Sequence, residues 1–219
     1  MMNAVILACS SLAVAVTAAQ KKMKTDFPVV YVDRKYHASP PDMRLQLMNA
    51  LEHVDDGTDT VLVAMGFCGG SWENIKTDKR IVIPYADDCV TISLHTDDTP
   101  CSDMKQRGHF YFKEPDRGNL TLESMEERLC RSKGEEEGKE TFQRWFQGID
   151  HIDIVDTELY DSYEPRHLAQ VQRDAELTGC SVNHVPGSNH LLEKLVSGRW
   201  DGQFLIVEPG KTLTGKDFE

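Results

Sequence analysis

The chain has 219 residues and a formal net charge of −12, because 36 acidic residues outnumber 24 basic ones. This charge argues against a protein that tracks nucleic-acid phosphates or anionic membrane surfaces, since no basic surplus exists to displace counterions. Six cysteines are scattered along a chain long enough to build its own core, which is unlike a small disulfide scaffold and indicates a reduced, cytoplasmic compartment.

The N-terminal stretch predicts a strand followed by a helix. Asn3–Cys9 is an apolar run typical of a buried strand, and Ser10 or Ser11 is placed to cap a helix that continues to about Lys24. The apolar run resembles a signal peptide, but no lysine or arginine precedes it and hydroxyl residues interrupt it. We therefore interpret it as part of the folded protein.

A second strand and helix follow. Pro28–Asp33 is rich in β-branched residues, and a loop with His37 comes after it. Ser39–Asp42 has the proline and cap residues of a helix start, and apolar residues recur at helical spacing until Gly57. The helix leads into Thr60–Cys68, an apolar run that ends in the turn GFCGG.

Strand and helix alternate once more. Arg80–Tyr85 predicts a strand, and Val90–His95 predicts the beginning of a helix that Asp87 or Asp88 can cap. This order predicts an α/β fold with a mostly parallel sheet, right-handed crossovers and Rossmann-like alternation.

The middle of the chain interrupts this pattern with an irregular helical insertion. His109–Phe112 predicts an edge strand, Leu122–Gln147 is helical in pattern, and strands and helices alternate again from His151 to Val207. We expect a single α/β domain over residues 1–219, with possible lobes at 1–115 and 150–219 joined by the helical segment 120–148.

Three cysteines share one location in this fold. Cys9 ends the first strand, Cys68 ends the third and Cys89 follows the fourth, so all lie at the carboxyl edge of the predicted sheet, where ligands bind in α/β proteins. His37 lies beyond the second strand on the same edge. The glycines Gly66, Gly69 and Gly70 let a ligand approach the backbone.

This set predicts a metal site. Three thiolates and an imidazole suit tetrahedral zinc, and three thiolates with an open position suit an iron–sulfur cluster. We assign Cys9, Cys68, Cys89 and His37 as ligands, with His37 and Asp88 also as candidate catalytic groups. The spacing is not a CxxC motif, so buried inert thiols, a metal-free reactive thiol and ordinary turn glycines remain alternatives.

Segments along almost the whole chain resemble the family known as domain of unknown function 1638. They are VILAC at Val5–Cys9, His37 with Pro40, GFCGG at Gly66–Gly70, IPYADDC at Ile83–Cys89, GHFYF at Gly108–Phe112 and SGRWDGQFLIVEPG at Ser197–Gly210. Family members usually carry glycine and histidine where this chain has Ser10 and Asp87. The family resembles an anaerobe-associated group often encoded near corrinoid-dependent methyl-transfer proteins.

Two functions fit these observations. The first is a metal-binding cytoplasmic protein that acts on a small molecule in one-carbon, corrinoid-linked methyl-transfer metabolism. The second is a non-enzymatic carrier or accessory protein that delivers a metal or cofactor to a methyltransferase partner. Neither function involves nucleic acid or a membrane.

Overall fold

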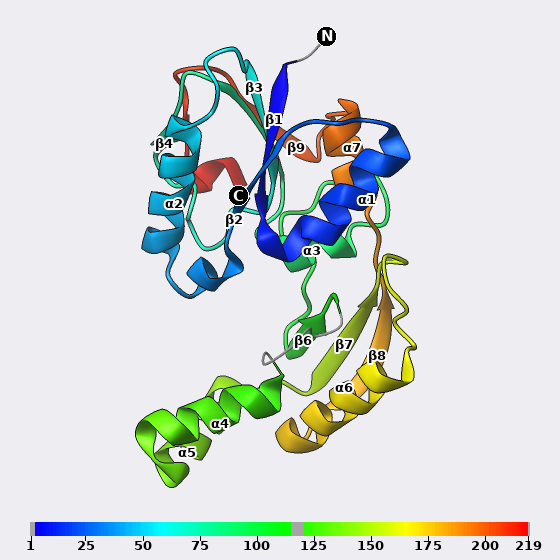
Figure 1. The fold of residues 1–219 in the computed structure, drawn as a ribbon. Coiled ribbons are helices and arrows are strands. Elements are labelled where there is room, and N and C mark those ends of the chain that lie inside the picture. The colour runs from blue at the N-terminus through cyan, green and yellow to red at the C-terminus, as the bar shows by residue number, and fades with distance from the viewer. Residues whose placement is uncertain (1–2, 115–120, 219) are drawn as a thin grey trace. The chain divides into compact units, whose positions relative to one another are not determined.

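The computed structural model describes residues 3–114 and 121–218. Within these ranges the chain forms two compact units, each described by itself below (Figure 1). The first unit combines residues up to 104 with those from 188 onwards, and the second consists of Lys105–Gly187. The chain therefore leaves the first unit once and later returns to it.

The first unit is built on a five-stranded sheet in the order β2-β1-β3-β5-β9. Its strands are β1 (Ala4–Cys9), β2 (Val29–Val32), β3 (Thr60–Ala64), β5 (Arg80–Pro84) and β9 (Phe204–Val207). The first four are parallel, and β9 runs antiparallel to β5. Every residue of β1 and β3 is buried, as expected for central strands covered on both faces. The predicted α/β class with a mostly parallel sheet is confirmed.

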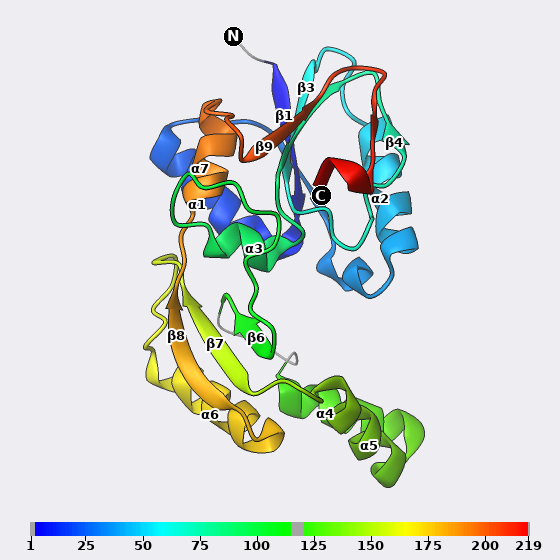
Figure 2. The same cartoon turned by 180° about the vertical axis from the view of Figure 1, so that it is seen from behind.

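Helices cover both faces of this sheet, with α2 on one side and α1 and α7 on the other (Figures 1 and 2). The helical elements are η1 (Ser10–Leu12), α1 (Ala13–Met23), η2 (Arg34–Ala38), α2 (Pro40–Glu52), α3 (Cys89–Leu94), α7 (His190–Ser197) and η3 (Gly215–Phe218). A small antiparallel pair, β4 (Ile75–Lys76) with β10 (Thr212–Leu213), completes the unit. Ser39 caps α2 by accepting a hydrogen bond from the Asp42 amide.

The start of α1 differs from the sequence-based expectation. Its cap position is Leu12, which provides no side-chain hydrogen bond. Ser10 and Ser11 lie in η1 instead, where the Ser10 hydroxyl accepts a hydrogen bond from the Arg34 amide and the Ser11 hydroxyl contacts Cys9 Sγ. The prediction that one of them caps the helix is therefore wrong, because the chain makes a tight 3₁₀ turn first.

The second unit has a three-stranded parallel sheet, β6-β7-β8, with β6 at its edge as predicted. The strands are β6 (His109–Phe112), β7 (His151–Asp156) and β8 (Ser181–Pro186), and the helices are α4 (Leu122–Lys133), α5 (Glu135–Trp145) and α6 (Pro165–Thr178). One sheet face packs on these helices through a core of Leu122, Phe142, Ile152, Ile154, Val171 and Ala175.

The helical segment expected over Leu122–Gln147 is divided into two helices. Gly134 lies between them with φ 93°, a conformation that favours glycine. A Cβ at Gly138 would lie 2.5 Å from the backbone of Cys130, so this glycine lets α5 pack directly against α4. The acidic run at the start of α5 contributes exposed ion pairs with lysines one turn away.

The boundaries of the two units differ from those of the lobes expected at 1–115 and 150–219. Strand β9 pairs with β5, and α7 packs against α1, so residues from 188 onwards belong to the first unit. Among the described residues, no helix has the length and apolar character needed to cross a membrane.

Candidate metal centre

The site is built at the carboxyl end of β1. Cys9 is the last residue of this strand and its side chain is buried. Because β1 pairs with β2 and β3 in parallel, the segments that follow these strands emerge at the same edge of the sheet. The strand therefore presents the Cys9 thiol to the loops of its neighbours.

His37 reaches this edge from η2, which follows β2. Asp33 caps η2 by accepting a hydrogen bond from the Lys35 amide at 2.9 Å. The Ser10 hydroxyl accepts another from the Arg34 amide at 2.9 Å, which ties η2 to the turn after β1. These two side chains hold His37 next to Cys9, while its ring stays exposed.

Cys89 comes from the first position of α3, after β5. Asp88 caps the helix, since its Oδ1 accepts a hydrogen bond from the Thr91 amide at 2.8 Å. Cys89 is 4% exposed. The predicted catalytic group Asp88 thus has a structural contact that fixes the start of α3 and with it the Cys89 thiol.

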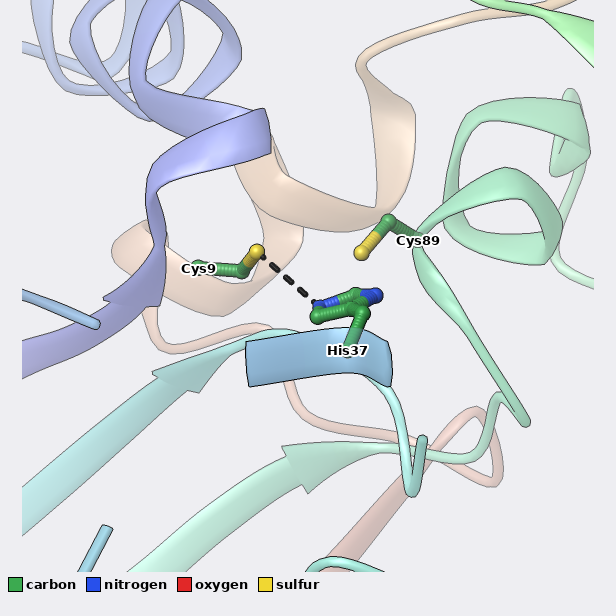
Figure 3. A group of neighbouring side chains, drawn as sticks. All are labelled: Cys9, His37 and Cys89. Carbon is green, nitrogen blue, oxygen red and sulfur yellow. Dashed lines mark hydrogen bonds between the residues drawn. The ribbon is translucent and has the colours of Figure 1, made fainter. Parts of the chain in front are cut away.

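The three side chains converge (Figure 3). One donor atom from each of Cys9, His37 and Cys89 lies within 4.8 Å of the other two, and Cys9 Sγ is 3.3 Å from His37 Nε2. Two thiols and an imidazole are ligands that zinc prefers, and their spacing leaves room for one ion among them. These three of the four predicted ligands form a candidate metal centre.

Ser11 is a member of the site that the sequence did not indicate. Its hydroxyl lies 3.1 Å from Cys9 Sγ and donates a hydrogen bond to Cys89 Sγ at 3.3 Å. It therefore bridges both sulfurs. The sequence offered no signal for this role, because the position of the hydroxyl depends on the 3₁₀ turn that follows Cys9.

The protonation of the Cys9 thiol depends strongly on the neighbouring Cys89 thiol. The hydrogen bond with Cys89 and the burial of the side chain raise the pKa of Cys9 to about 12, although His37 and Ser11 act in the opposite direction. Cys9 consequently keeps its proton at neutral pH when no cation is bound. A metal ion must displace this proton, so its binding is expected to be pH-dependent.

Cys68 is not part of the converging group. It has φ 51°, its amide donates to the Asp87 carbonyl at 2.6 Å, and it packs against the core of the first unit. The described donor atoms within 4.8 Å of one another include no atom of Cys68. The sequence located its turn correctly at the sheet edge but gave no information on the left-handed backbone that orients this residue.

The glycines of the same turn have backbone roles. A Cβ at Gly66 would lie 2.6 Å from the backbone of Asp88, so this glycine permits close packing between the two turns. Gly69 and Gly70 have φ values of 63° and 88°, which shape the turn itself. Each of the three candidate ligand-binding glycines thus has a structural reason to be glycine, which is steric at Gly66 and conformational at Gly69 and Gly70.

A buried lysine holds the segment that carries Cys89. The Lys194 side chain is 4% exposed. Its Nζ donates hydrogen bonds to three side-chain oxygens, those of Asp98 (2.7 Å), Gln203 (2.7 Å) and Asp201. Gln203 Nε2 donates in turn to the Asp97 carbonyl at 2.9 Å, and the Asp87 amide donates to Ser102 further along the same loop. This network fixes the loop after α3.

The fold and the site define an α/β protein with a candidate cysteine–cysteine–histidine metal centre. A family model described as Protein of unknown function (DUF1638) matches residues 31–196. Since this is more than half of the chain, the chain belongs to that family, and the resemblance noted in the sequence is confirmed. The match includes His37 and Cys89, whereas Cys9 precedes it. No curated protein and no solved structure matches the chain.

Proposed function

We propose that this chain is a cytoplasmic zinc protein that uses Cys9, Cys89 and His37 as ligands and acts on a small molecule in methyl-transfer metabolism. The observation that carries the proposal is the convergence of these three donors within 4.8 Å. The six cysteines are all free, which supports a reduced compartment.

The donor set fits zinc better than an iron–sulfur cluster. Tetrahedral zinc with bonds of about 2.3 Å to sulfur places its ligand atoms about 3.5–3.8 Å apart, which agrees with a group confined to 4.8 Å. Iron–sulfur clusters are commonly held by four cysteines, whereas two thiols converge among the described residues. Zinc is therefore the cofactor we favour.

Three protein ligands are typical of a catalytic zinc site, because the fourth position stays open for substrate. When bound there, zinc lowers the pKa of a thiol or water molecule and makes it nucleophilic at neutral pH. Cys9 and Cys89 are buried and His37 is exposed, so substrate approaches from the side of the imidazole.

The reaction we propose is methyl transfer to a small-molecule thiol. The thiol loses its proton to solvent, and its sulfur then forms a bond to the methyl carbon. The bond between methyl group and donor breaks, and the electron pair stays on the donor. The donor is a corrinoid or a corrinoid-dependent methyltransferase partner.

A carrier function is the second candidate, and the exposure of His37 favours it specifically. This ligand lies on a five-residue 3₁₀ helix at the surface, so it can move away from the metal ion without disturbing the elements that carry the two buried thiols. A carrier should transfer its zinc to the apo-form of a methyltransferase partner, whereas a catalyst should retain zinc through turnover.

Metal analysis of anaerobically purified protein tests the proposal. We expect one equivalent of zinc in the wild-type chain, loss of zinc in Cys9→Ser and in Cys89→Ser, and full retention in Cys180→Ser as the matched control. Cys68→Ser reports whether Cys68 supplies the fourth ligand. A wild-type protein that stays metal-free after reconstitution with zinc, or one that shows the visible absorption of an iron–sulfur cluster, would overturn the zinc assignment.

A further inference from the structure

A buried histidine closes the loop that follows α3. His95 lies directly after this helix and is 1% exposed. Its Nε2 lies 3.0 Å from the carbonyl oxygen of Cys101. A carbonyl only accepts hydrogen bonds, so Nε2 carries a proton and donates it. The side chain therefore holds the two ends of the loop 95–101 together.

The other ring nitrogen of His95 contacts a group that can only donate. Its Nδ1 lies 3.2 Å from Gln203 Nε2. The orientation of this amide is fixed, because Gln203 Oε1 accepts a hydrogen bond from Lys194 Nζ at 2.7 Å and Nε2 donates to the Asp97 carbonyl at 2.9 Å. The second amide hydrogen is shared with the Thr99 carbonyl at 3.3 Å. Because amide nitrogen accepts no hydrogen bond, a proton on Nδ1 would face an N–H group.

Both contacts require the neutral form of the His95 ring, with its proton on Nε2. Burial is the main cause that lowers its pKa below the ordinary value of 6.5, while the Cys101 carbonyl and Asp97 oppose this shift. Positive charge on Lys194 acts in the same direction as burial, because it disfavours a second cation nearby. The other titratable groups around this network are His190, Asp98 and Asp201.

The loop that His95 closes also holds the segment before Cys89. Ser102 directly follows the residue whose carbonyl His95 contacts, and its own carbonyl accepts a hydrogen bond from the Asp87 amide at 2.6 Å. The next residue, Asp88, caps α3 and thereby fixes Cys89 at the first helical position. Hydrogen bonds and adjacent residues thus connect the His95 ring to a ligand of the metal centre.

We propose that His95 is a pH-sensitive switch that opens the loop 95–103 in mild acid and thereby weakens the metal centre. Protonation of Nδ1 replaces the hydrogen bond from Gln203 with two N–H groups that face each other, and it adds a charge to a buried ring. The ring then leaves its site, and the Asp87 amide loses its acceptor when the loop moves. Weaker metal binding rests on the proposed zinc function, whereas the opening of the loop does not.

The direction of the pH dependence follows from the ionisation of His95. Its pKa in the folded protein lies below 6.5, so the opened loop, in which the ring is solvated, binds a proton more tightly than the closed loop. The closed loop therefore has its full stability above about pH 6.5 and loses stability as pH falls below this value. Asp98, with a pKa of about 2, titrates in a lower range and can be measured separately.

Hydrogen exchange of the metal-free, full-length protein tests the opening of the loop. After correction for intrinsic rates, we expect protection of the Asp87 amide to fall about tenfold between pH 7.5 and pH 5.5 in the wild type. In His95→Gln, the new side chain can still donate to the Cys101 carbonyl but does not titrate, so protection should change less than about twofold. His190→Gln removes a neighbouring histidine on α7 and is the matched control, which should show the wild-type fall.

Zinc release tests the consequence for the metal centre. On going from pH 7.5 to pH 5.5, the rate of zinc transfer to a chelator should rise more in the wild type than in His95→Gln, since protonation of the ligands is common to both. Circular dichroism confirms that each variant remains folded.

Three results would overturn the switch. They are wild-type protection that does not change with pH, an equal fall in His95→Gln, and a ring ¹⁵N spectrum at pH 7.5 that places the proton on Nδ1. Equal zinc release in both chains would overturn the connection to the metal centre. A chain that shows the expected exchange but binds no zinc would contradict the proposed function and support the opening of the loop.

Discussion

Two sulfurs and one hydroxyl meet at the end of β1, and the hydroxyl of Ser11 contacts both sulfurs. A hydroxyl that donates to a thiolate favours its charged form, and Ser11 acts in this direction on the pKa of Cys9. A buried pair of thiols that must lose protons to bind a cation benefits from such a donor. Ser11 is thus expected to adjust the affinity of the site without being a ligand.

The variant Ser11→Ala tests this role. We expect zinc affinity at neutral pH to fall about tenfold, because the pKa of Cys9 rises further once the hydroxyl is removed. The measurement is a chelator competition between pH 6 and 9, and the difference from wild type should stay constant over this range, because it lies well below the Cys9 pKa of about 12. Ser132→Ala on α4 is the control. An affinity equal to wild type at every pH would remove Ser11 from the site.

Asp98 makes the stability of the folded protein depend on pH in the acid range. Hydrogen bonds from Lys194 and His190 lower the pKa of Asp98 from 3.8 to about 2. Its folded pKa lies below its unfolded value, so the unfolded state binds more protons between these limits. The stability that this carboxylate contributes is therefore complete above about pH 4 and is lost as pH falls toward 2.

We expect the Asp98→Asn substitution to make the free energy of unfolding less dependent on pH in the acid range. The free energy of unfolding, measured by urea titration at pH 2.5 and at pH 5, should differ less between the two pH values in the variant than in the wild type. Asp26→Asn changes an exposed carboxylate without a described hydrogen bond and should keep the wild-type difference. An equal pH dependence in wild type and Asp98→Asn would show that the Lys194 network does not act through this group.

At the scale of elements, the position of Cys89 depends on the contact between two turns. The turn after β3 donates backbone hydrogen bonds from Phe67 and Cys68 to the carbonyls of Ala86 and Asp87. Gly66 makes the contact possible, because a Cβ there would lie 2.6 Å from the Asp88 backbone. Backbone cannot rotate away as a flexible side chain can, so the turns must separate if Gly66 gains a side chain.

Gly66→Ala should therefore lower stability by about 1–3 kcal/mol, as overpacking usually does, and also weaken zinc binding by displacing Cys89. Gly70→Ala in the same turn meets no atom closer than 3.9 Å. Its cost comes from the φ of 88° and should be about 1–2 kcal/mol, with zinc affinity unchanged. Thermal unfolding and zinc titration of both variants check the contrast. Equal zinc affinities in the two variants would contradict it.

Parallel topology made three site residues predictable. Cys9 ends β1, His37 follows β2 and Cys89 follows β5, and parallel strands deliver such residues to one edge. Cys68 also follows a parallel strand, but its positive φ of 51° determines where its side chain lies. The sequence pattern does not predict such a backbone angle for a cysteine. The pairing of β9 with β5 could not be predicted from the sequence either, because an apolar strand of four residues can pair with either sheet.

At the scale of the whole molecule, the second unit is an insertion in the first, and first-unit residues next to both insertion points contact one helix. Thr91 Oγ1 donates to Asp103 at 3.5 Å, and the Ser188 amide donates to the Ser93 carbonyl at 2.8 Å. Thr91 and Ser93 are two residues apart on α3. The chain therefore leaves and re-enters the first unit at neighbouring points, and a short linker can join them.

We expect the first unit to fold and bind zinc without residues 105–187. A Gly/Ser linker of about six residues, which spans roughly 13 Å, replaces the removed segment between Met104 and Ser188. The shortened chain keeps the five-stranded sheet, its helices and all three ligands, so it should hold one equivalent of zinc with wild-type affinity. A chain that ends at residue 115 is the control. It lacks α7 and β9, which exposes β5 and the buried face of α1, and it should be unfolded or aggregated. Dispersed amide NMR signals and zinc titration distinguish these outcomes, and a shortened chain that stays unfolded with zinc present would show that the first unit requires the second.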